Sequence, residues 1–377
     1  MNHFSKIILK EPQLQTLFSQ LTEMGYEIYG PTVRDEAIVY DRLFSVDSLP
    51  KGWTDVQEAG KYRLQRTNEK WLFHFNLGPH SWKKFLFPAR RRVWKTSKTE
   101  TTVTFTPDDI PKTKMAFLGV KACELEALFI QDKVFQNDIA TDEYYATLRK
   151  RLFLIVTNCT KANGTCFCVS MNTGPKAKTG YDLALTEWCT PESHEFLAES
   201  GSSEGEKILQ SLQGQPATET EENRRDLQLA STADQMGKSL NTLGVKELLY
   251  RNTQSPQWEE IGQRCLSCAN CTMVCPTCFC STVEDTTDLT GNHAERWRSW
   301  DSCFNLDFSY VHGGSVRNST ASRYRQWMTH KLASWQDQFG SSGCVGCGRC
   351  ITWCPVGIDI TEAVAQLRKA DASHAKS

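Results

Sequence analysis

Two apolar runs of strand length stand on either side of a helical pattern in the first half of the chain. The runs are Met115–Val120 and Leu152–Thr157, and each is almost continuously apolar, as in strands that are buried on both faces of a sheet. Between them, Glu124–Phe135 has apolar residues at helical spacing and acidic residues in its first turn, and Asp142–Lys150 forms a second short helix. This strand–helix–strand crossover predicts neighbouring parallel strands and therefore an α/β fold for the N-terminal domain.

Weaker patterns precede the crossover. Pro12–Gly25 places its leucines on one helical face, with a proline in the first turn and a glycine at the C-terminal cap. The basic and aromatic segment Lys83–Arg92 is expected to be a solvated loop, with a docking surface for an acidic partner or an anion as the alternative. Three further strands are predicted from β-branched and aromatic runs: Ala37–Tyr40, Trp71–Phe75 and Thr101–Phe105.

The composition changes after the first two hundred residues. Residues 199–244 are rich in Ser, Gln, Glu and Gly, which predicts a polar linker. The linker divides an α/β domain, residues 1–198, from a mainly α-helical ferredoxin-like dicluster domain, residues 245–377. Within the second domain, Ser281–Gly343 contains four tryptophans that we expect to form a hydrophobic shell, and a final helix is predicted to begin at Asp359.

Charge and cysteine content limit the functional classes. The chain has 377 residues, with 43 basic and 44 acidic side chains and a formal net charge of −1. This balance gives no electrostatic reason to expect nucleic acid or an anionic membrane as a partner, and the apolar runs are too short to span a bilayer. Sixteen cysteines without a visible export signal predict a cytoplasmic protein whose thiols bind metal.

The strongest chemical signal is a cysteine motif that occurs twice. Both copies read Cys-x2-Cys-x2-Cys-x3-Cys-Pro, the spacing of bacterial ferredoxins with two [4Fe-4S] clusters, in which the fourth cysteine of each run binds the other run's cluster. The predicted ligands are therefore Cys265, Cys268, Cys271 and Cys354 for cluster 1, and Cys344, Cys347, Cys350 and Cys275 for cluster 2. Structural zinc gives the third cysteine and the Cys-Pro pair no role, and a disulfide framework suits short secreted chains.

Four more cysteines follow the two crossover strands. Cys123 and Cys159 come directly after the parallel strands, so both are expected at the carboxyl edge of the sheet. Cys166 and Cys168 lie on the loop that begins there, and the four thiols predict a third [4Fe-4S] cluster, with zinc or ordinary buried cysteines as the alternatives. A position at a helix N-terminus is expected to lower the pKa of Cys123.

The remaining cysteines have no assigned role. Cys278, Cys280 and Cys303 lie close to the motifs, either as neighbours of the cluster ligands or as a further metal site, and Cys189 stands apart. We find no dinucleotide-binding or Walker A motif in the sequence, and we predict no catalytic residues. Several clusters without substrate chemistry indicate a non-catalytic subunit that relays electrons.

The sequence resembles the β subunit of cytoplasmic sulfhydrogenases, which are NAD(P)-linked nickel–iron hydrogenases. The segments that carry the resemblance are Lys84–Pro88, Gly119–Glu124, Cys166–Cys168, Cys275–Cys280, Trp300–Cys303 and Gly343–Cys350. The resemblance implies an iron–sulfur electron-transfer subunit whose partners are a flavin subunit that exchanges electrons with NAD(P) and the small and large subunits of the hydrogenase. The A subunit of anaerobic sulfite reductase is similar at the same places. A metal-stabilised scaffold without redox function is a further alternative.

Overall fold

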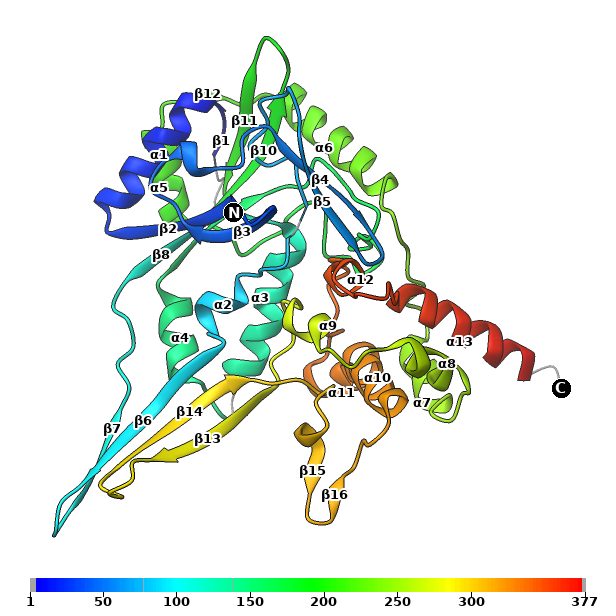
Figure 1. Ribbon diagram of the computed structural model, residues 1–377. Helices are drawn as coiled ribbons and strands as arrows, with labels where there is room; N and C mark the ends of the chain where they lie inside the picture. Colours follow the sequence, from blue (N-terminus) through cyan, green and yellow to red (C-terminus); the bar gives the residue numbers. More distant parts are fainter. Residues whose placement is uncertain (1–4, 77, 138, 375–377) are drawn as a thin grey trace.

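The computed structural model describes residues 5–76, 78–137 and 139–374 (Figure 1). The N-terminal stretch on which the expectation about export rests therefore begins outside the described residues. The strands are β1 Lys6–Lys10, β2 Tyr26–Arg34, β3 Ala37–Arg42, β4 Trp53–Glu58, β5 Lys61–Arg66, β6 Arg90–Lys98, β7 Val103–Pro107, β8 Lys114–Val120, β9 Leu152–Thr157, β10 Leu183–Cys189, β11 His194–Ser200, β12 Gln215–Pro216, β13 Ser281–Thr287, β14 His293–Trp300, β15 Tyr310–Val311 and β16 Gly314–Ser315. The α-helices are α1 Glu11–Glu23, α2 Lys83–Leu86, α3 Ala122–Phe135, α4 Glu143–Lys150, α5 Ser203–Ser211, α6 Glu219–Asp234, α7 Val245–Arg251, α8 Gln257–Arg264, α9 Asn270–Met273, α10 Thr320–Thr329, α11 Trp335–Phe339, α12 Arg349–Thr352 and α13 Ile360–His374.

The N-terminal part is built on a mixed sheet in the order β12-β1-β11-β10-β9-β8-β2-β3. Its centre is parallel, because β8 pairs with both β2 and β9, and β9 pairs with β10, in parallel register. The crossover predicted from the two apolar runs is confirmed, with α3 and α4 between neighbouring parallel strands β8 and β9. Both strands therefore end at the same edge of the sheet, where Cys123 and Cys159 follow them.

Helices cover both faces of this sheet, which explains why its central strands are apolar throughout. On one face, Leu14 and Leu17 of α1 and Leu209 of α5 pack with the sheet residues Ile28 and Phe196. On the other face, α3 and α4 pack against β8 and β9.

Helix α3 is buried on two sides, because it separates the sheet from the C-terminal region. Leu125 and Leu128 pack toward the sheet. Ala127 and Ile130 join a separate cluster with Val345 and Trp335 of the C-terminal region. A helix that is apolar on more than one face is expected where it lies inside a protein rather than on its surface. The side chain of Cys123 in the first turn of α3 therefore faces the boundary between the two regions.

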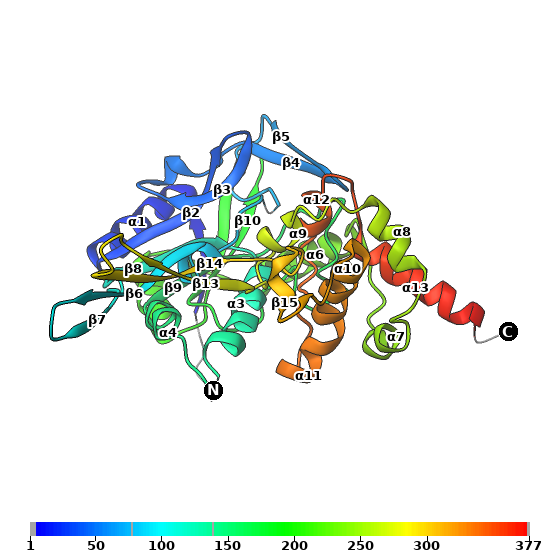
Figure 2. The same ribbon diagram turned by 60° about the horizontal axis from the view of Figure 1, so that its bottom comes forward.

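A second sheet joins the two halves of the chain. The hairpin β6–β7 comes from the N-terminal half and the hairpin β13–β14 from between the cysteine motifs, and they form one sheet in the order β13-β14-β6-β7. Figure 1 shows this sheet as a long arm below the main body, and Figure 2 shows it from another side. The expectation of a mainly α-helical C-terminal domain is therefore met only in part, since β13–β16 accompany the helices α7–α13.

Residues 199–244 are folded rather than extended. They contain α5 and α6, and Ile208, Leu209 and Leu212 are buried in the core of the first sheet. The apolar residues of α5 are few, so the polar composition hid a helix that covers the sheet with a narrow apolar stripe. The domain limits drawn at this stretch stay a prediction, but its description as an exposed linker is wrong.

The predicted strand Trp71–Phe75 is also wrong, since this segment has no regular structure. The backbone N–H groups of Leu72 and Phe73 donate to the buried carboxylate of Glu187 at 2.5 and 2.7 Å, so they are not available to a strand ladder. Glu187 also contacts Nε2 of His194 at 2.7 Å, and Nδ1 of His194 lies 3.0 Å from Glu11. A histidine between two carboxylates thus ties this segment to the sheet.

We expect this histidine to make the stability of the fold depend on pH. Burial lowers the pKa of His194, but the hydrogen bonds and charges of Glu187 and Glu11 outweigh burial and raise it above the ordinary 6.5. A raised folded-state pKa contributes stability below about pH 6.5, and this contribution is lost as the pH rises through the folded value. Thermal unfolding of the wild type should therefore shift to lower temperature between about pH 6 and pH 8, and His194→Gln should flatten this dependence. An identical slope in the variant would contradict the prediction.

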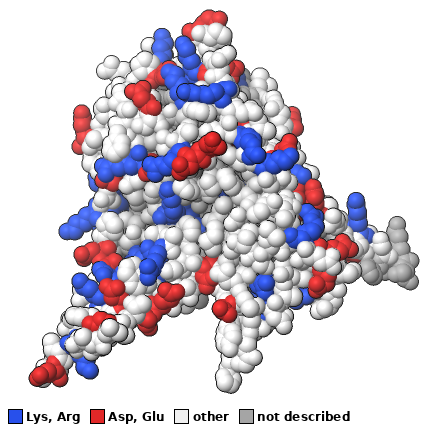
Figure 3. Space-filling view, in the orientation of Figure 1, with Lys and Arg blue, Asp and Glu red and all other residues white. Residues whose placement is uncertain are grey.

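The surface carries mixed charge. Figure 3 shows Lys and Arg interspersed with Asp and Glu over the face seen in Figure 1, in agreement with the small net charge. Within the described ranges, no helix is both long and apolar enough to cross a membrane. The expected solvated loop at Lys83–Arg92 is wrong, because Lys83 and Leu86 are buried in α2 and Arg90 begins β6. A docking role for this segment is not supported by the burial of Lys83.

Candidate metal centres

The two cysteine motifs fold in the same way. In each, the N–H two residues after the first cysteine lies near its sulfur: Ser267 N is 3.5 Å from Cys265 Sγ, and Gly346 N is 3.4 Å from Cys344 Sγ. The residues directly before and after the second cysteine have positive φ in both motifs. These positions are Ser267 and Ala269 in the first motif, with φ of 50° and 65°, and Gly346 and Gly348 in the second, with φ of 66° and 76°. A short helix follows in each, α9 or α12, so the repeat in sequence is also a repeat in backbone conformation.

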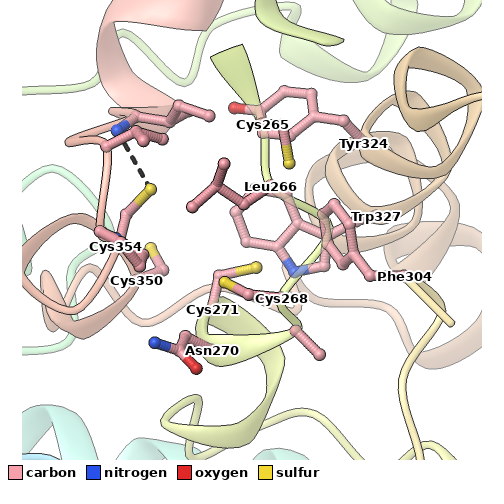
Figure 4. Close-up of a pocket in the computed structure, with 14 residues that line it drawn as sticks. Cys265, Leu266, Cys268, Asn270, Cys271, Phe304, Tyr324, Trp327, Cys350 and Cys354 are labelled. Carbon is pink, nitrogen blue, oxygen red and sulfur yellow. Dashed lines mark hydrogen bonds between the residues drawn. The ribbon is translucent and has the colours of Figure 1, made fainter. Parts of the chain in front are cut away.

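The first group of thiols surrounds a cavity. Cys265, Cys268 and Cys271 of the first motif and Cys354 of the second all line it. Figure 4 shows their sulfur atoms around one space, with Phe304, Tyr324 and Trp327 on one side. These three aromatic side chains are buried, as expected for a hydrophobic shell that keeps water away from a cluster. Cys268 is exposed, so this group lies near the protein surface.

The second group contains three cysteines of the second motif and one cysteine of the first. Cys344, Cys347 and Cys350 come from the second motif, and the charge of Cys275 from the first acts on each of them. The ammonium of Lys331 lies 3.2 Å from Cys275 Sγ and also donates to Thr277 Oγ1 and to the carbonyl of Gly343, both at 3.1 Å. Each motif therefore supplies one cysteine to the other's group, as the ferredoxin spacing predicts.

The third group lies at the carboxyl edge of the main sheet. Cys123 begins α3, Cys159 follows β9, and Cys166 and Cys168 come from the next loop. Cys159 acts electrostatically on each of the other three thiols, so the four lie near one another. Cys347 of the second group also raises the pKa values of Cys123, Cys166 and Cys168.

The loop that carries Cys166 and Cys168 packs against the second motif. Phe167 donates its N–H to the carbonyl of Gly346 at 2.9 Å, and Thr173 Oγ1 donates to the carbonyl of Val345 at 2.6 Å. A Cβ added to Gly346 would lie 2.6 Å from the carbonyl oxygen of Phe167. This close approach explains why glycine suits this position of the second motif, where a side chain would collide with the backbone of Phe167.

Replacing Gly346 with alanine should therefore destabilise the contact between the second and third groups. Gly340 has nearly the same φ, 67° against 66°, but a Cβ there would meet no atom within 4 Å. Gly340→Ala should cost about 1–2 kcal/mol of unfolding free energy from backbone conformation alone, and Gly346→Ala should cost clearly more because of the added clash. Chemical unfolding of both variants measures the difference in unfolding free energy. Equal losses would show that the close approach at Gly346 adds nothing to the cost of the substitution.

Burial raises the pKa values of most of these thiols in the metal-free chain. The pKa of Cys166 and that of Cys344 rise to about 12, with burial as the largest cause. Burial also raises the pKa of Cys123 well above its ordinary value, assisted by the neighbouring thiols. The expected lowering of the Cys123 pKa at the helix N-terminus is therefore wrong, because burial is the largest influence and raises this pKa. Cys275 is the exception, since hydrogen bonding from Cys278 and the charge of Lys331 lower its pKa despite burial.

Buried cations accompany the thiol groups. Lys121 is 1% exposed, Lys83 and Lys331 are each 3% exposed, and none of them forms an ion pair with a carboxylate of a described residue. Lys121 acts on Cys159 of the third group, and Lys331 contacts Cys275 of the second. A buried ammonium costs several kcal/mol unless negative charge lies close to it. Thiolates bound to an anionic iron–sulfur cluster would provide that charge, so the residues present fit such a group.

From the sequence, Lys83 was named only within the basic segment Lys83–Arg92, and neither Lys121 nor Lys331 was singled out. Each lies in an otherwise apolar or aromatic stretch, for example Lys121 after FLGV and Lys331 in WMTHKLASW. A lysine inside an apolar stretch was therefore the sequence signal that could have predicted a buried lysine.

A single metal ion makes a different demand on its ligands. Within the described ranges, no three or more His, Cys, Asp or Glu side chains are arranged to hold one ion. Zinc brings all its ligands to one centre, whereas a [4Fe-4S] cluster takes one thiolate at each of four iron corners. The ligand assignments for the three groups stay predictions.

Comparison with known proteins gives the family. The profile described as a 4Fe-4S dicluster domain matches residues 264–358, which include both cysteine motifs. The sulfhydrogenase 2 subunit beta of Pyrococcus furiosus is 31% identical over 355 residues, covering 93% of this chain and 95% of its own length. The chain belongs to the sulfhydrogenase β-subunit family. No solved structure matches it.

Membership of the sulfhydrogenase β-subunit family extends over nearly the whole chain, including the α/β part that the dicluster profile does not reach. With the dicluster domain, it identifies an iron–sulfur electron-transfer subunit of the hydrogenase class that contains [4Fe-4S] clusters. The resemblance stated from the sequence is thereby confirmed at the level of the family.

Proposed function

We propose that this chain relays electrons within an NAD(P)-linked nickel–iron hydrogenase complex of the cytoplasm, between a flavin subunit that exchanges electrons with NAD(P) and the small and large hydrogenase subunits. The observation that carries the proposal is the crossed arrangement of thiols from the two motifs, with all four members of the first group around one cavity. When bound, [4Fe-4S] clusters take up and release single electrons.

We assign Cys265, Cys268, Cys271 and Cys354 to cluster 1, Cys344, Cys347, Cys350 and Cys275 to cluster 2, and Cys123, Cys159, Cys166 and Cys168 to cluster 3. The second group lies between the other two. Cys347 packs in the same apolar cluster as Cys123 and Cys168, while Cys350 lines the cavity of the first group. The thiol groups thus form a continuous series from the sheet edge to the exposed Cys268.

Side chains of this chain set the electrostatic environment of the thiol groups. Lys121 and Lys331 place ammonium groups beside the third and second groups. Buried aromatic side chains exclude water from the first group. The ammonium groups favour electron uptake, whereas the exclusion of water disfavours the more negative reduced state, so the two effects act on the potential in opposite directions.

Purification of the native complex without oxygen tests the function. We expect nickel and hydrogen-dependent reduction of NAD(P) to accompany the chain. Sirohaem and sulfite-dependent oxidation of the reduced nucleotide would instead assign it to an anaerobic sulfite reductase. Absorbance near about 400 nm that bleaches with dithionite is expected, whereas a colourless chain would support a redox-silent scaffold.

The third cluster has its own test. Cys123→Ser should reduce the iron content by about four atoms while the first two clusters keep their signals. Unchanged iron would remove the third group from the assignment, and loss of all iron would indicate misfolding rather than loss of one site. Cys189→Ser, whose thiol lies outside the three groups, serves as a variant that should keep all its iron.

A further inference from the structure

Three cysteines outside these groups are brought together by the hairpin β13–β14. Ser281 pairs with Trp300 at the open end of the hairpin, and Asp301 donates its N–H to the carbonyl of Cys280 at 2.9 Å. This pairing places Cys280 beside Cys303, and the two thiols interact with each other. The charge of Cys280 acts on Cys278, which also interacts with Cys275 of the second group.

A cavity opens at the thiols of Cys280 and Cys303. It has a volume of about 280 Å³, and Cys280, Cys303 and His330 line it together with Phe279, Phe308 and Gln326. Nε2 of His330 lies 3.1 Å from the amide oxygen of Gln338. An Nε2–H that donates to this oxygen leaves a lone pair on Nδ1, the arrangement in which histidine binds a metal while a neighbouring group fixes its ring.

Two of the buried ammonium groups face this site. Lys331 Nζ lies 3.6 Å from Cys278 Sγ, and Lys83 Nζ donates to the carbonyl of Cys278 at 3.1 Å. Lys83 also lies 3.9 Å from the ring centroid of Trp300. Neither has a carboxylate partner among the described residues, so negative charge on the nearby thiolates would stabilise both ammonium groups.

The sequence around these cysteines repeats that of the third group. Cys278-Phe279-Cys280 has the same three residues as Cys166-Phe167-Cys168. In both places the triplet meets further thiols or metal-binding side chains from distant segments, beside a buried lysine.

We propose that Cys278, Cys280 and Cys303, with His330 as the fourth ligand, hold an additional iron–sulfur cluster beside the second group. The inference rests on the proposed cluster-binding function of the chain. Three thiolates and one imidazole would occupy the four corners, and the three thiol protons leave when the cluster binds. Lys83 and Lys331 supply the compensating positive charge.

Iron analysis of the full chain, prepared without oxygen, tests the proposal. Cys303→Ser and Cys280→Ser should each lose about four iron atoms relative to the wild type. Cys189→Ser is the matched control, because Cys189 ends β10 and is half-buried beside Glu187, and it should keep all its iron. Wild-type iron content in both variants would overturn the additional cluster, as would a Cys280–Cys303 disulfide found by alkylation before and after reduction. A wild type without iron would instead defeat the proposed function itself.

Exchange of the imidazole for a thiol tests the fourth ligand. His330→Cys should keep the iron but move one midpoint potential to a more negative value, because imidazole ligands raise the potential relative to thiolate ligands. Electron paramagnetic resonance during a redox titration measures this shift. An unchanged set of potentials would exclude His330 from the ligand set.

Discussion

Arg349→Met is expected to lower the unfolding free energy by about 3–5 kcal/mol, since it breaks a buried ion pair from one side. Arg349 Nη2 lies 2.5 Å from Glu124 Oε1, and both side chains are almost inaccessible to solvent. The guanidinium also donates to the carbonyls of Gly78 at 2.9 Å and His80 at 2.7 Å. The pair joins Glu124, the residue after Cys123, to Arg349, which begins α12 and lies between Cys347 and Cys350, so it connects the third group to the second.

The remaining carboxylate explains the size of the expected effect. Without Arg349, Glu124 would keep hydrogen bonds from Tyr40 Oη at 2.5 Å and Trp82 Nε1 at 3.1 Å but would lose its counter-charge. The double variant Arg349→Met with Glu124→Leu should therefore be more stable than Arg349→Met alone.

Urea denaturation under anaerobic conditions measures these changes. Arg296→Met provides the control, because its partner Asp285 and Arg296 itself are well exposed, with side-chain exposures of 51% and 41%. Its loss should cost far less than the loss of Arg349, because water screens an exposed pair. A cost for Arg349→Met as small as that of the control would contradict the prediction.

The crossed arrangement of the two motifs predicts which cysteine variants affect the same cluster. Cys271→Ser and Cys354→Ser should each remove about four iron atoms, and the double variant should remove no more than either one alone. Cys271→Ser combined with Cys344→Ser should remove about eight, because these residues belong to different groups. The proximity of Cys354 to Cys265 and Cys271 is the structural reason.

Iron and acid-labile sulfide analysis gives the numbers, with Cys189→Ser carried through the same preparation. If the double variant Cys271→Ser with Cys354→Ser lost about eight iron atoms, the two residues would belong to different clusters, and each motif would bind its own cluster with all four of its cysteines. That result would contradict the exchange of the fourth cysteine.

The features predicted well from the sequence depend on local patterns. The apolar runs at Met115–Val120 and Leu152–Thr157 correspond to β8 and β9, because a strand covered on both faces has no polar side to obscure it. The cysteine spacing likewise predicted which thiols lie close together, since a ferredoxin-type loop fixes the backbone over a few residues.

The features missed depend on contacts between distant segments. The pairing of β6 with β14 joins residues about two hundred positions apart, and neither strand carries a signal for its partner. The helices within residues 199–244 were hidden by their polar outer faces. The salt bridge between Glu124 and Arg349 could not be predicted either, because it forms only where α3 packs against the second motif.

The sheet shared by β6–β7 and β13–β14 has a consequence for how the chain matures. Neither half can complete this sheet alone, because each contributes one hairpin to it, and the first group needs Cys354 from the second motif. Fragments cut near residue 244 should therefore bind iron poorly. The first group can bind its metal only after the chain has been synthesised through Cys354, so its other thiols need protection from oxygen until then.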